Sequence, residues 1–401
     1  MADRVPTRAL VLRTSPMFVL SFFWAGAQHI LPQLYLLTHA PEDKAAVLAA
    51  LLGLGTACAA LGVALSRRRV ARPVPLGLSS LLGWLLATLI TFSALVLPVE
   101  PLAAFVVAYG AFRLVSNVLY NHLDCALLAT ARGGAARHAT AVAVWQIAGQ
   151  TVGPAAFVAL AGHQAATLLA VVVLGAGALA ALSRLRGAFG ASPPPAPGHD
   201  ASLSSRARRL LAYTFLLQTG VVGLLGNMIF LLKDWVRVDA PEQAAGALIS
   251  GMGVLSAVVA VRSRRVMASQ PSPWSVVWPA LLLAVTPAIL LARPGVPGLV
   301  LAALAAGIGG GRYLVGTRQL ASMWTEAPGP AALLGRYNNV ANVASLTGYA
   351  LSGGVALILG EGHLAYVYAL LGMFGALFLA AAALAGLRPF TADPPSAPAP
   401  G

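Results

Sequence analysis

The sequence predicts an all-α membrane protein of twelve transmembrane helices, arranged as two pseudo-symmetric six-helix bundles. Three observations support this fold class. The 401 residues are 58% hydrophobic and only 9% charged, a composition typical of integral membrane proteins. Apolar runs of about 20 residues, long enough to cross a bilayer, recur along the chain. The second half also repeats the layout of the first, with Arg312 placed 199 residues after Arg113.

Six apolar runs make up the first half, and we expect each to form one spanning helix. They cover residues 15–37, 45–65, 75–97, 101–131, 139–161 and 165–182. A cleavable signal peptide is the alternative for the first run, because Ala25-Gly26-Ala27 resembles a small-residue cleavage site. Its removal would leave an odd number of spans. We therefore assign residues 1–186 to an N-terminal bundle.

A change in composition separates the two halves. Residues 183–209 combine consecutive prolines with five arginines, so we expect a flexible cytoplasmic linker over residues 187–208. Six further apolar runs follow at residues 210–232, 244–261, 274–292, 297–323, 331–359 and 363–387. We assign residues 209–388 to a C-terminal bundle and expect residues 389–401 to be a disordered tail.

The positive charges predict the orientation of these spans. With both termini inside, nineteen of the 26 Lys and Arg residues lie on the cytoplasmic side, four lie outside and three lie within spans. We therefore expect a multi-pass protein of the inner (plasma) membrane with both termini cytoplasmic, surrounded by the lipid bilayer and monomeric. The net charge of +14 does not indicate a nucleic-acid partner, because the charges lie in short segments between spans.

Several other classes of protein find no support in the sequence. Cys58 and Cys125 are the two cysteines, and both fall inside apolar runs, which argues against a disulfide framework or a cysteine metal site. No nucleotide-binding motif appears, and no cluster of nucleophile, base and metal ligands occurs at one depth. We expect no cofactor, no metal and no enzymatic activity.

Of the three arginines within spans, Arg318 lies near a cytoplasmic end, whereas Arg113 and Arg312 lie deeper, where a charged side chain costs several kcal/mol unless it faces protein or water. Arg113 falls near the middle of residues 101–131, and Asn117 and Asp124 follow on the same helical face. Arg312 takes the matching place in the second half, because residues 110–113 align without a gap on residues 309–312. Two such arginines, related by an internal repeat, indicate a functional site inside the membrane.

The six-plus-six layout and the basic central linker resemble the major facilitator superfamily of secondary transporters over nearly the whole chain. Arginine-rich segments after the second and eighth runs add to the resemblance: Arg67, Arg68 and Arg69 in the first half, Arg264 and Arg265 in the second. The first of them is similar to the superfamily's signature between helices 2 and 3, although a serine, Ser66, stands where an aspartate is usual.

Two further motifs resemble those of drug/proton antiporters within this superfamily. Arg113 falls where these antiporters carry the arginine of their helix 4 motif, without the Gln-Gly that normally follows. Residues 149–154, Gly-Gln-Thr-Val-Gly-Pro, resemble the core of their helix 5 motif. The motifs match only in part, so no subfamily is assigned.

The resemblance implies alternating access to a central cavity, lined by helices 1, 4, 7 and 10 with helices 5 and 11 beside them. Seven polar residues would then lie near the substrate: Gln28, His29, Arg113, Asn117, Gln150, Arg312 and Asn342. No carboxylate lies at the depth of the two arginines, since Asp124 is eleven residues from Arg113. Guanidinium groups bind carboxylate or phosphate through paired hydrogen bonds. We therefore expect Arg113 and Arg312 to clamp a small organic or inorganic anion.

Alternatives remain at several of these positions. Arg113 is a structural or coupling residue in the alternative interpretation, as its motif allows. His29 is either a proton carrier, because histidine titrates near neutral pH, or a packing residue. Asp124 is a second coupling candidate, and the five arginines after runs 2 and 8 are gating candidates. Coupling to protons or to a counter-transported ion stays open, as do antiporter-like efflux of amphipathic compounds and a non-transporting role as an assembly factor.

Overall fold

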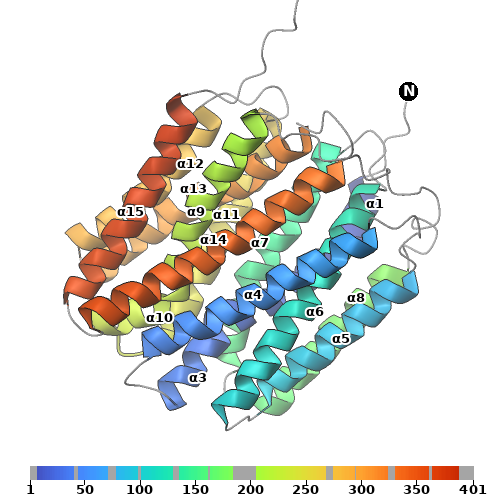
Figure 1. Ribbon diagram of the computed structural model, residues 1–401, viewed down its shortest axis with the longest axis horizontal. Helices are drawn as coiled ribbons and strands as arrows, with labels where there is room; N and C mark the ends of the chain where they lie inside the picture. The colour runs from blue at the N-terminus through green and yellow to red at the C-terminus, as the bar shows by residue number, and fades with distance from the viewer. Residues whose placement is uncertain are drawn as a thin grey trace, which may run out of the picture.

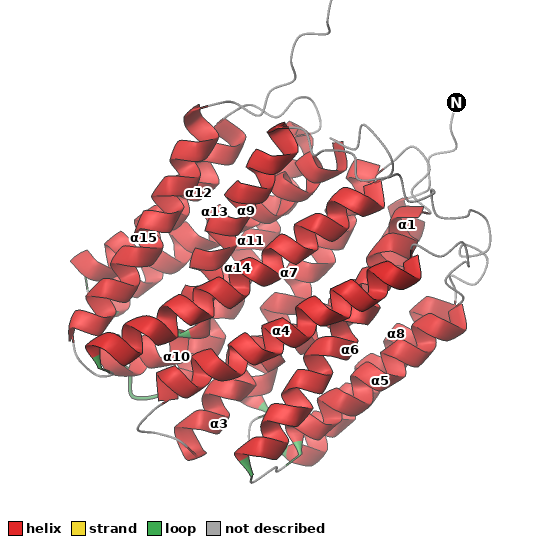
Figure 2. Cartoon of the chain, viewed as in Figure 1, coloured by secondary structure: helices red, strands yellow, loops and turns green. Residues whose placement is uncertain are grey.

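The computed structural model describes residues 7–39, 44–70, 78–97, 101–129, 135–160, 163–183, 205–267, 274–293, 295–323, 330–360 and 364–387. All regular elements within these ranges are helices (Figure 2). Eleven helical segments of the described chain are long and apolar enough to cross a membrane. The remaining predicted span is helix α12, Trp274–Ala292, whose apolar stretch Val276–Ala292 is shorter. Each of the twelve apolar runs therefore corresponds to helical structure.

The helices of the first half follow the predicted order. They are α1 (Thr7–Thr14), α2 (Pro16–Ala25), the π-helical turn η1 (Gly26–Ile30), α3 (Leu31–His39), α4 (Lys44–Val70), α5 (Leu78–Val96), α6 (Leu102–Ala129), α7 (Ala135–Ala159) and α8 (Gln164–Ser183). The segment α1 to α3 is the first span.

The second half has the same order of elements. They are α9 (Ser205–Gly226), α10 (Met228–Leu231), the π-helical turn η2 (Leu232–Val236), α11 (Pro241–Met267), α12, α13 (Val296–Met323), α14 (Pro330–Leu359) and α15 (Leu364–Leu387). Helix α9 begins at Ser205, inside the region expected to be a linker. Most of that linker and the tail 389–401 lie outside the described residues.

The two halves form neighbouring bundles. Helix α4 packs against α14, and α7 packs against α11 and α13, so these helices join the halves. Figure 1 shows α4 and α14 side by side along this boundary. The starts of α1 and α9 and the end of α15 lie at one end of the molecule, which we call the terminal end (Figure 1). The opposite end, where α3 ends and α4 begins, is the far end.

The first helix of each half is irregular. A π-helical turn, Gly26–Ile30, interrupts the first span, and in the second half the chain turns at Asn227 before a second π-helical turn, Leu232–Val236. The helical structure expected over residues 15–37 and 210–232 is present, and these turns interrupt it. Turns of this kind are rare in proteins overall, and many of those that occur lie at functional sites. The wider turn changes which side chains face the same direction.

Glycine allows close helix packing at two positions that the sequence singled out. A Cβ atom at Gly149 of α7 would meet the backbone oxygen of Phe18 in α2, and one at Gly311 of α13 would meet the backbone oxygen of Ser256 in α11. Small residues of this kind let helix backbones approach each other within membranes. The glycines of both motifs therefore position the helices around the cavity.

The arginine-rich segments after runs 2 and 8 lie at helix ends instead of in loops. Helix α4 continues through Val70 and α11 through Met267. The side chains of Arg67, Arg68, Arg69, Arg264 and Arg265 lie outside the described residues. Their gating role stays a prediction.

Candidate binding cavity

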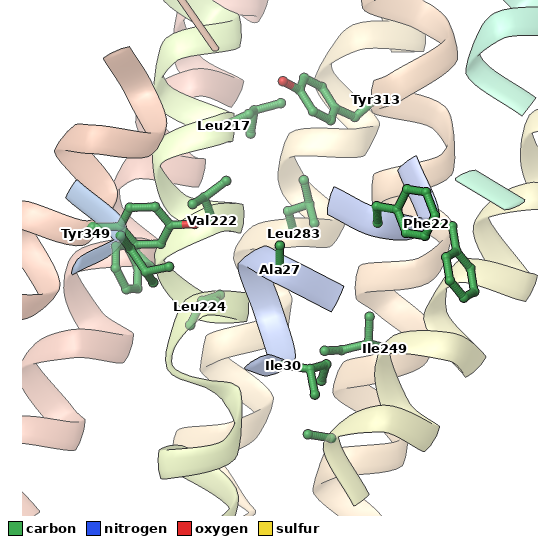
Figure 3. Close-up of a cluster of buried hydrophobic side chains, with 14 of the residues drawn as sticks. Phe22, Ala27, Ile30, Leu217, Val222, Leu224, Ile249, Leu283, Tyr313 and Tyr349 are labelled. Carbon is green, nitrogen blue, oxygen red and sulfur yellow. The ribbon is translucent and has the colours of Figure 1, made fainter. Parts of the chain in front are cut away.

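A cavity of about 280 Å³ is bounded by both halves of the molecule. Six lining residues come from the first half: Trp24, Gln28, His29, Arg113, Ile147 and Gln150. The other lining residues belong to helices of the second half, α9 to α15. Figure 3 shows how η1 reaches this boundary, with Ala27 and Ile30 lying among apolar side chains of the second half, including Leu224 and Leu283.

Arg113 is the cationic side chain in the wall of this cavity. Its exposed fraction is 4%, and its Nη1 donates a hydrogen bond to Gln28 Oε1 at 2.9 Å. The guanidinium also lies over the Trp24 ring, 5.9 Å from the ring centroid, a distance at which cation and ring attract. Within the described chain, its buried Nε has no hydrogen-bond partner. Arg113 thus keeps hydrogen-bonding capacity for a ligand.

Gln28 connects Arg113 to the second half of the molecule. Its side-chain nitrogen donates to Tyr349 Oη in α14 at 2.6 Å, while its oxygen accepts from Arg113. The hydrogen-bonded chain Arg113–Gln28–Tyr349 therefore runs from α6 through η1 to α14. Any separation of the two halves at this depth must break or rearrange it.

His29 follows Gln28 within the same π-helical turn and also lines the cavity. Its exposed fraction is 9%, and its Nδ1 has no hydrogen-bond partner among the described residues. The turn thus presents two consecutive polar side chains to one cavity. Gln150 of α7 completes the polar side contributed by the first half.

Acidic side chains are absent from the described lining of the cavity. The polar lining residues of the second half are uncharged: Gln218, Ser256, Thr286, Tyr313, Asn342 and Ser345. An anion bound at Arg113 would therefore meet no carboxylate in this wall. A cation bound there would meet no neutralising charge.

The structure brings together five of the seven residues that the sequence predicted near a substrate. Gln28, His29, Arg113, Gln150 and Asn342 all line the cavity. The remaining two, described next, do not.

Asn117 is buried, but it is not among the lining residues. Its side-chain nitrogen donates to the backbone oxygen of Arg113 at 2.8 Å, one turn back on α6. Asp124, a coupling candidate further along the same helix, is buried as well and does not line the cavity. Its coupling role stays a prediction.

Arg312 is the clear correction to the sequence prediction. Its side chain is exposed, and it shares the outer face of α13 with the exposed Leu301 and Leu304, whereas Gly310 and Leu314 face the cavity. The clamp of two arginines in one cavity is therefore wrong. An alignment of sequences without gaps therefore did not give the direction of this side chain around its helix.

Sequence reasoning missed other residues around the site. Trp24 lies under the Arg113 guanidinium, and its Nε1 donates to Ser116 Oγ at 2.9 Å. Tyr349 lies on the polar face that the eleventh apolar run presents, with Asn342 and Ser345, but its hydrogen bond to Gln28 was not predicted. Nothing in the sequence distinguishes Trp24 from other aromatic residues of the first span.

Two six-span halves that enclose a cavity define the class of fold, which is that of the major facilitator superfamily transporters. Three solved structures of this class show the likeness. The human organic anion transporter MFSD10 (TETRAN) has a TM-score of 0.69 and 16% sequence identity, covering 95% of this chain and 100% of that chain. The nucleoside transporter NupG has a TM-score of 0.64 and 13% identity, covering 94% and 98%.

A third similar structure is that of the peptide transporter POT, with a TM-score of 0.68 and 14% identity, covering 95% of this chain and 94% of that chain. No protein-family model matches the sequence, and no curated protein sequence matches it. The likeness therefore establishes the fold, and the chemistry of the site must come from the residues of this chain.

Proposed function

We propose that this chain is a secondary active transporter that moves a small anionic solute across a membrane by alternating access, with Arg113 as the anion-binding residue. The observation that carries the proposal is the burial of Arg113, only 4% exposed, in a cavity wall that contains no acidic side chain among the described residues. The three similar structures are all transporters, and MFSD10 among them is an organic anion transporter.

The chemistry of Arg113 suits reversible anion binding. A guanidinium stays charged at all physiological pH values and offers a planar set of donors to a carboxylate or phosphate. A buried donor without a partner is unfavourable by about 1–3 kcal/mol, more for a charged group, and Arg113 Nε is such a donor among the described residues. An anion that accepts from it would remove this penalty. Gln28, His29, Gln150 and Asn342 would act as neutral partners.

The remaining parts of the proposal follow from the fold and the charge pattern. We place the protein in the inner membrane as a monomer with both termini in the cytoplasm, and the solute as its small-molecule partner. Because no carboxylate lines the described cavity, coupling would use His29, the protonation of the solute itself, or exchange against a second ion.

Uptake into proteoliposomes tests the proposal, because Arg312 provides a matched control. We expect Arg113→Ala to reduce the initial rate of uptake of the transported anion at least tenfold. Arg113→Lys should retain part of the wild-type rate. Arg312→Ala should transport like the wild type, because its side chain lies outside the cavity wall. Equal rates for wild type and Arg113→Ala, with both proteins shown to be folded and inserted, would overturn the proposal.

Efflux of amphipathic compounds is the second candidate function, favoured by the many apolar side chains in the cavity wall. Transport of a neutral or cationic amphiphile that is unaffected by Arg113→Ala would support this candidate instead.

A further inference from the structure

The cavity is chemically divided between the two halves of the molecule. The first half contributes Arg113, Gln28, His29 and Gln150. The second half contributes a predominantly aliphatic surface, which we call the apolar wall: Val221, Leu225, Met228, Ile249, Met252 and Leu283. A ligand that fills the cavity must therefore present different chemistry to its two sides.

Most polar groups of the second half are already engaged by their own bundle. Ser256 Oγ donates to the backbone oxygen of Gly307 at 2.7 Å, and Ser345 Oγ donates to that of Ala341 at 2.8 Å. A hydroxyl that donates its proton to its own bundle has no donor left for a ligand. These positions consequently reinforce the apolar character of this side.

Thr286 and Tyr313 follow the same pattern. Thr286 Oγ1 donates to the backbone oxygen of Leu282 at 3.2 Å, and Tyr313 Oη donates to Gln218 Oε1 at 3.3 Å. No cationic side chain of the described second half lines the cavity. A charged group of a ligand directed toward the apolar wall would lose its hydration without gaining a counter-charge, which is strongly unfavourable.

The charge count limits the ligand further. One permanently charged cation, Arg113, lines the described cavity, and Arg312 lies outside it. A second negative charge on a ligand would have no permanent counter-charge. A volume of about 280 Å³ lies just below the usual range for ligand pockets, which begins at about 300 Å³, so the ligand is small.

We infer that the solute is a small amphipathic monoanion, with its charged head on Arg113 in the first half and its apolar body against the wall of the second half. The inference rests on the proposed function and specifies its substrate class. Carboxylates and sulfonates share the required head chemistry. Inorganic anions such as phosphate and dianions such as dicarboxylates are poor ligands.

Calorimetric titration of the full chain in lipid nanodiscs tests this inference, with the heats of empty nanodiscs subtracted. The probes are butanoate, hexanoate and octanoate, with octanedioate, octanamide and inorganic phosphate for comparison. Each added CH₂ should tighten binding about fourfold until the cavity is full, since burying a CH₂ is worth about 0.8 kcal/mol. Octanedioate and octanamide should each bind at least tenfold more weakly than octanoate.

Three variants separate the contribution of the charged head from that of the apolar body. Arg113→Gln should weaken octanoate at least tenfold and leave octanamide unchanged, while Arg312→Gln changes neither. Met252→Gln, which keeps the side-chain length, should weaken octanoate several-fold and leave butanoate unchanged. Circular dichroism and size-exclusion profiles that match the wild type establish that the variants are folded.

The outcomes distinguish this inference from the proposed function. Arg113-dependent binding of phosphate or octanedioate as tight as that of octanoate would overturn the substrate class and leave anion transport standing. Octanamide binding as tightly as octanoate, unaffected by Arg113→Gln, would overturn both. Absence of octanoate binding above empty nanodiscs would also overturn the inference.

Discussion

An ion pair closes the far end of the molecule between the two halves. Lys44 Nζ, at the start of α4, lies 3.2 Å from Asp234 Oδ2 in η2, and the two side chains are only 12% and 22% exposed. The same ammonium lies over the Phe230 ring, 5.4 Å from its centroid. If the halves rock apart at this end, as alternating access requires, these contacts must break. We predict that Lys44→Met favours the state that is open at the far end.

The magnitude follows from the geometry. At 3.2 Å and an effective dielectric constant of about 20, two unit charges attract by about 5 kcal/mol. Desolvation and the ordering of both side chains offset most of this, which leaves about 1 kcal/mol for a partly exposed pair. About 1 kcal/mol corresponds to a fivefold change in the ratio of closed to open states.

Distances between spin labels across the far end measure this ratio. We would place labels at Thr38 of α3 and Leu359 of α14, in a variant whose two cysteines are replaced by serine. Lys44→Met should raise the ratio of the longer-distance to the shorter-distance population about fivefold. Lys233→Met is the matched control, because Lys233 lies beside Asp234 in η2 and its side chain is exposed. This variant should leave the distance distribution unchanged. Exchanging the charges with Lys44→Asp and Asp234→Lys should restore the wild-type distribution. An unchanged distribution in Lys44→Met would refute this reasoning.

Three further predictions concern stability. Gln28→Leu should lower the free energy of unfolding by about 2 kcal/mol, because Arg113 loses its hydrogen-bond acceptor, and Tyr349→Phe should lower it by about 1 kcal/mol. Thermal denaturation in detergent measures both losses. A larger loss in Tyr349→Phe than in Gln28→Leu would contradict this prediction. Arg237→Gly should raise the melting temperature, because Arg237 adopts a left-handed backbone conformation with φ of 59° that disfavours a side chain by about 1 kcal/mol; a lower melting temperature would count against this. Gly149→Val should sharply reduce the yield of monodisperse protein, because a side chain there meets the α2 backbone; normal yield and stability would show that the helices can separate.

The spans were predictable because their signal is the length of an apolar run, which can be counted in the sequence. An apolar run of about 20 residues has few alternatives to a membrane-spanning helix, and each of the twelve runs coincides with helical structure. Arg113 could be singled out for a related reason, since an arginine at mid-span requires protein or water around it. Depth along the membrane is thus readable from a sequence.

Rotation around each helix was not readable in the same way. Arg312 was misplaced because its position in the repeat gave its depth, whereas its side chain is exposed and does not line the cavity. The apolar wall escaped notice because leucine and valine facing lipid, core or cavity look alike in a sequence. The π-helical turn that presents both Gln28 and His29 to the cavity leaves no mark in composition.

An electron cryo-microscopy map of the full chain with 8-bromooctanoate bound is the sharpest test that Arg113 binds the charged head of an amphipathic anion. The bromine marks the apolar end of the ligand. We predict carboxylate density about 2.8 Å from the Arg113 guanidinium, with the bromine against Met252 and Leu283. Carboxylate density away from Arg113, or a bromine beside it, would contradict the account.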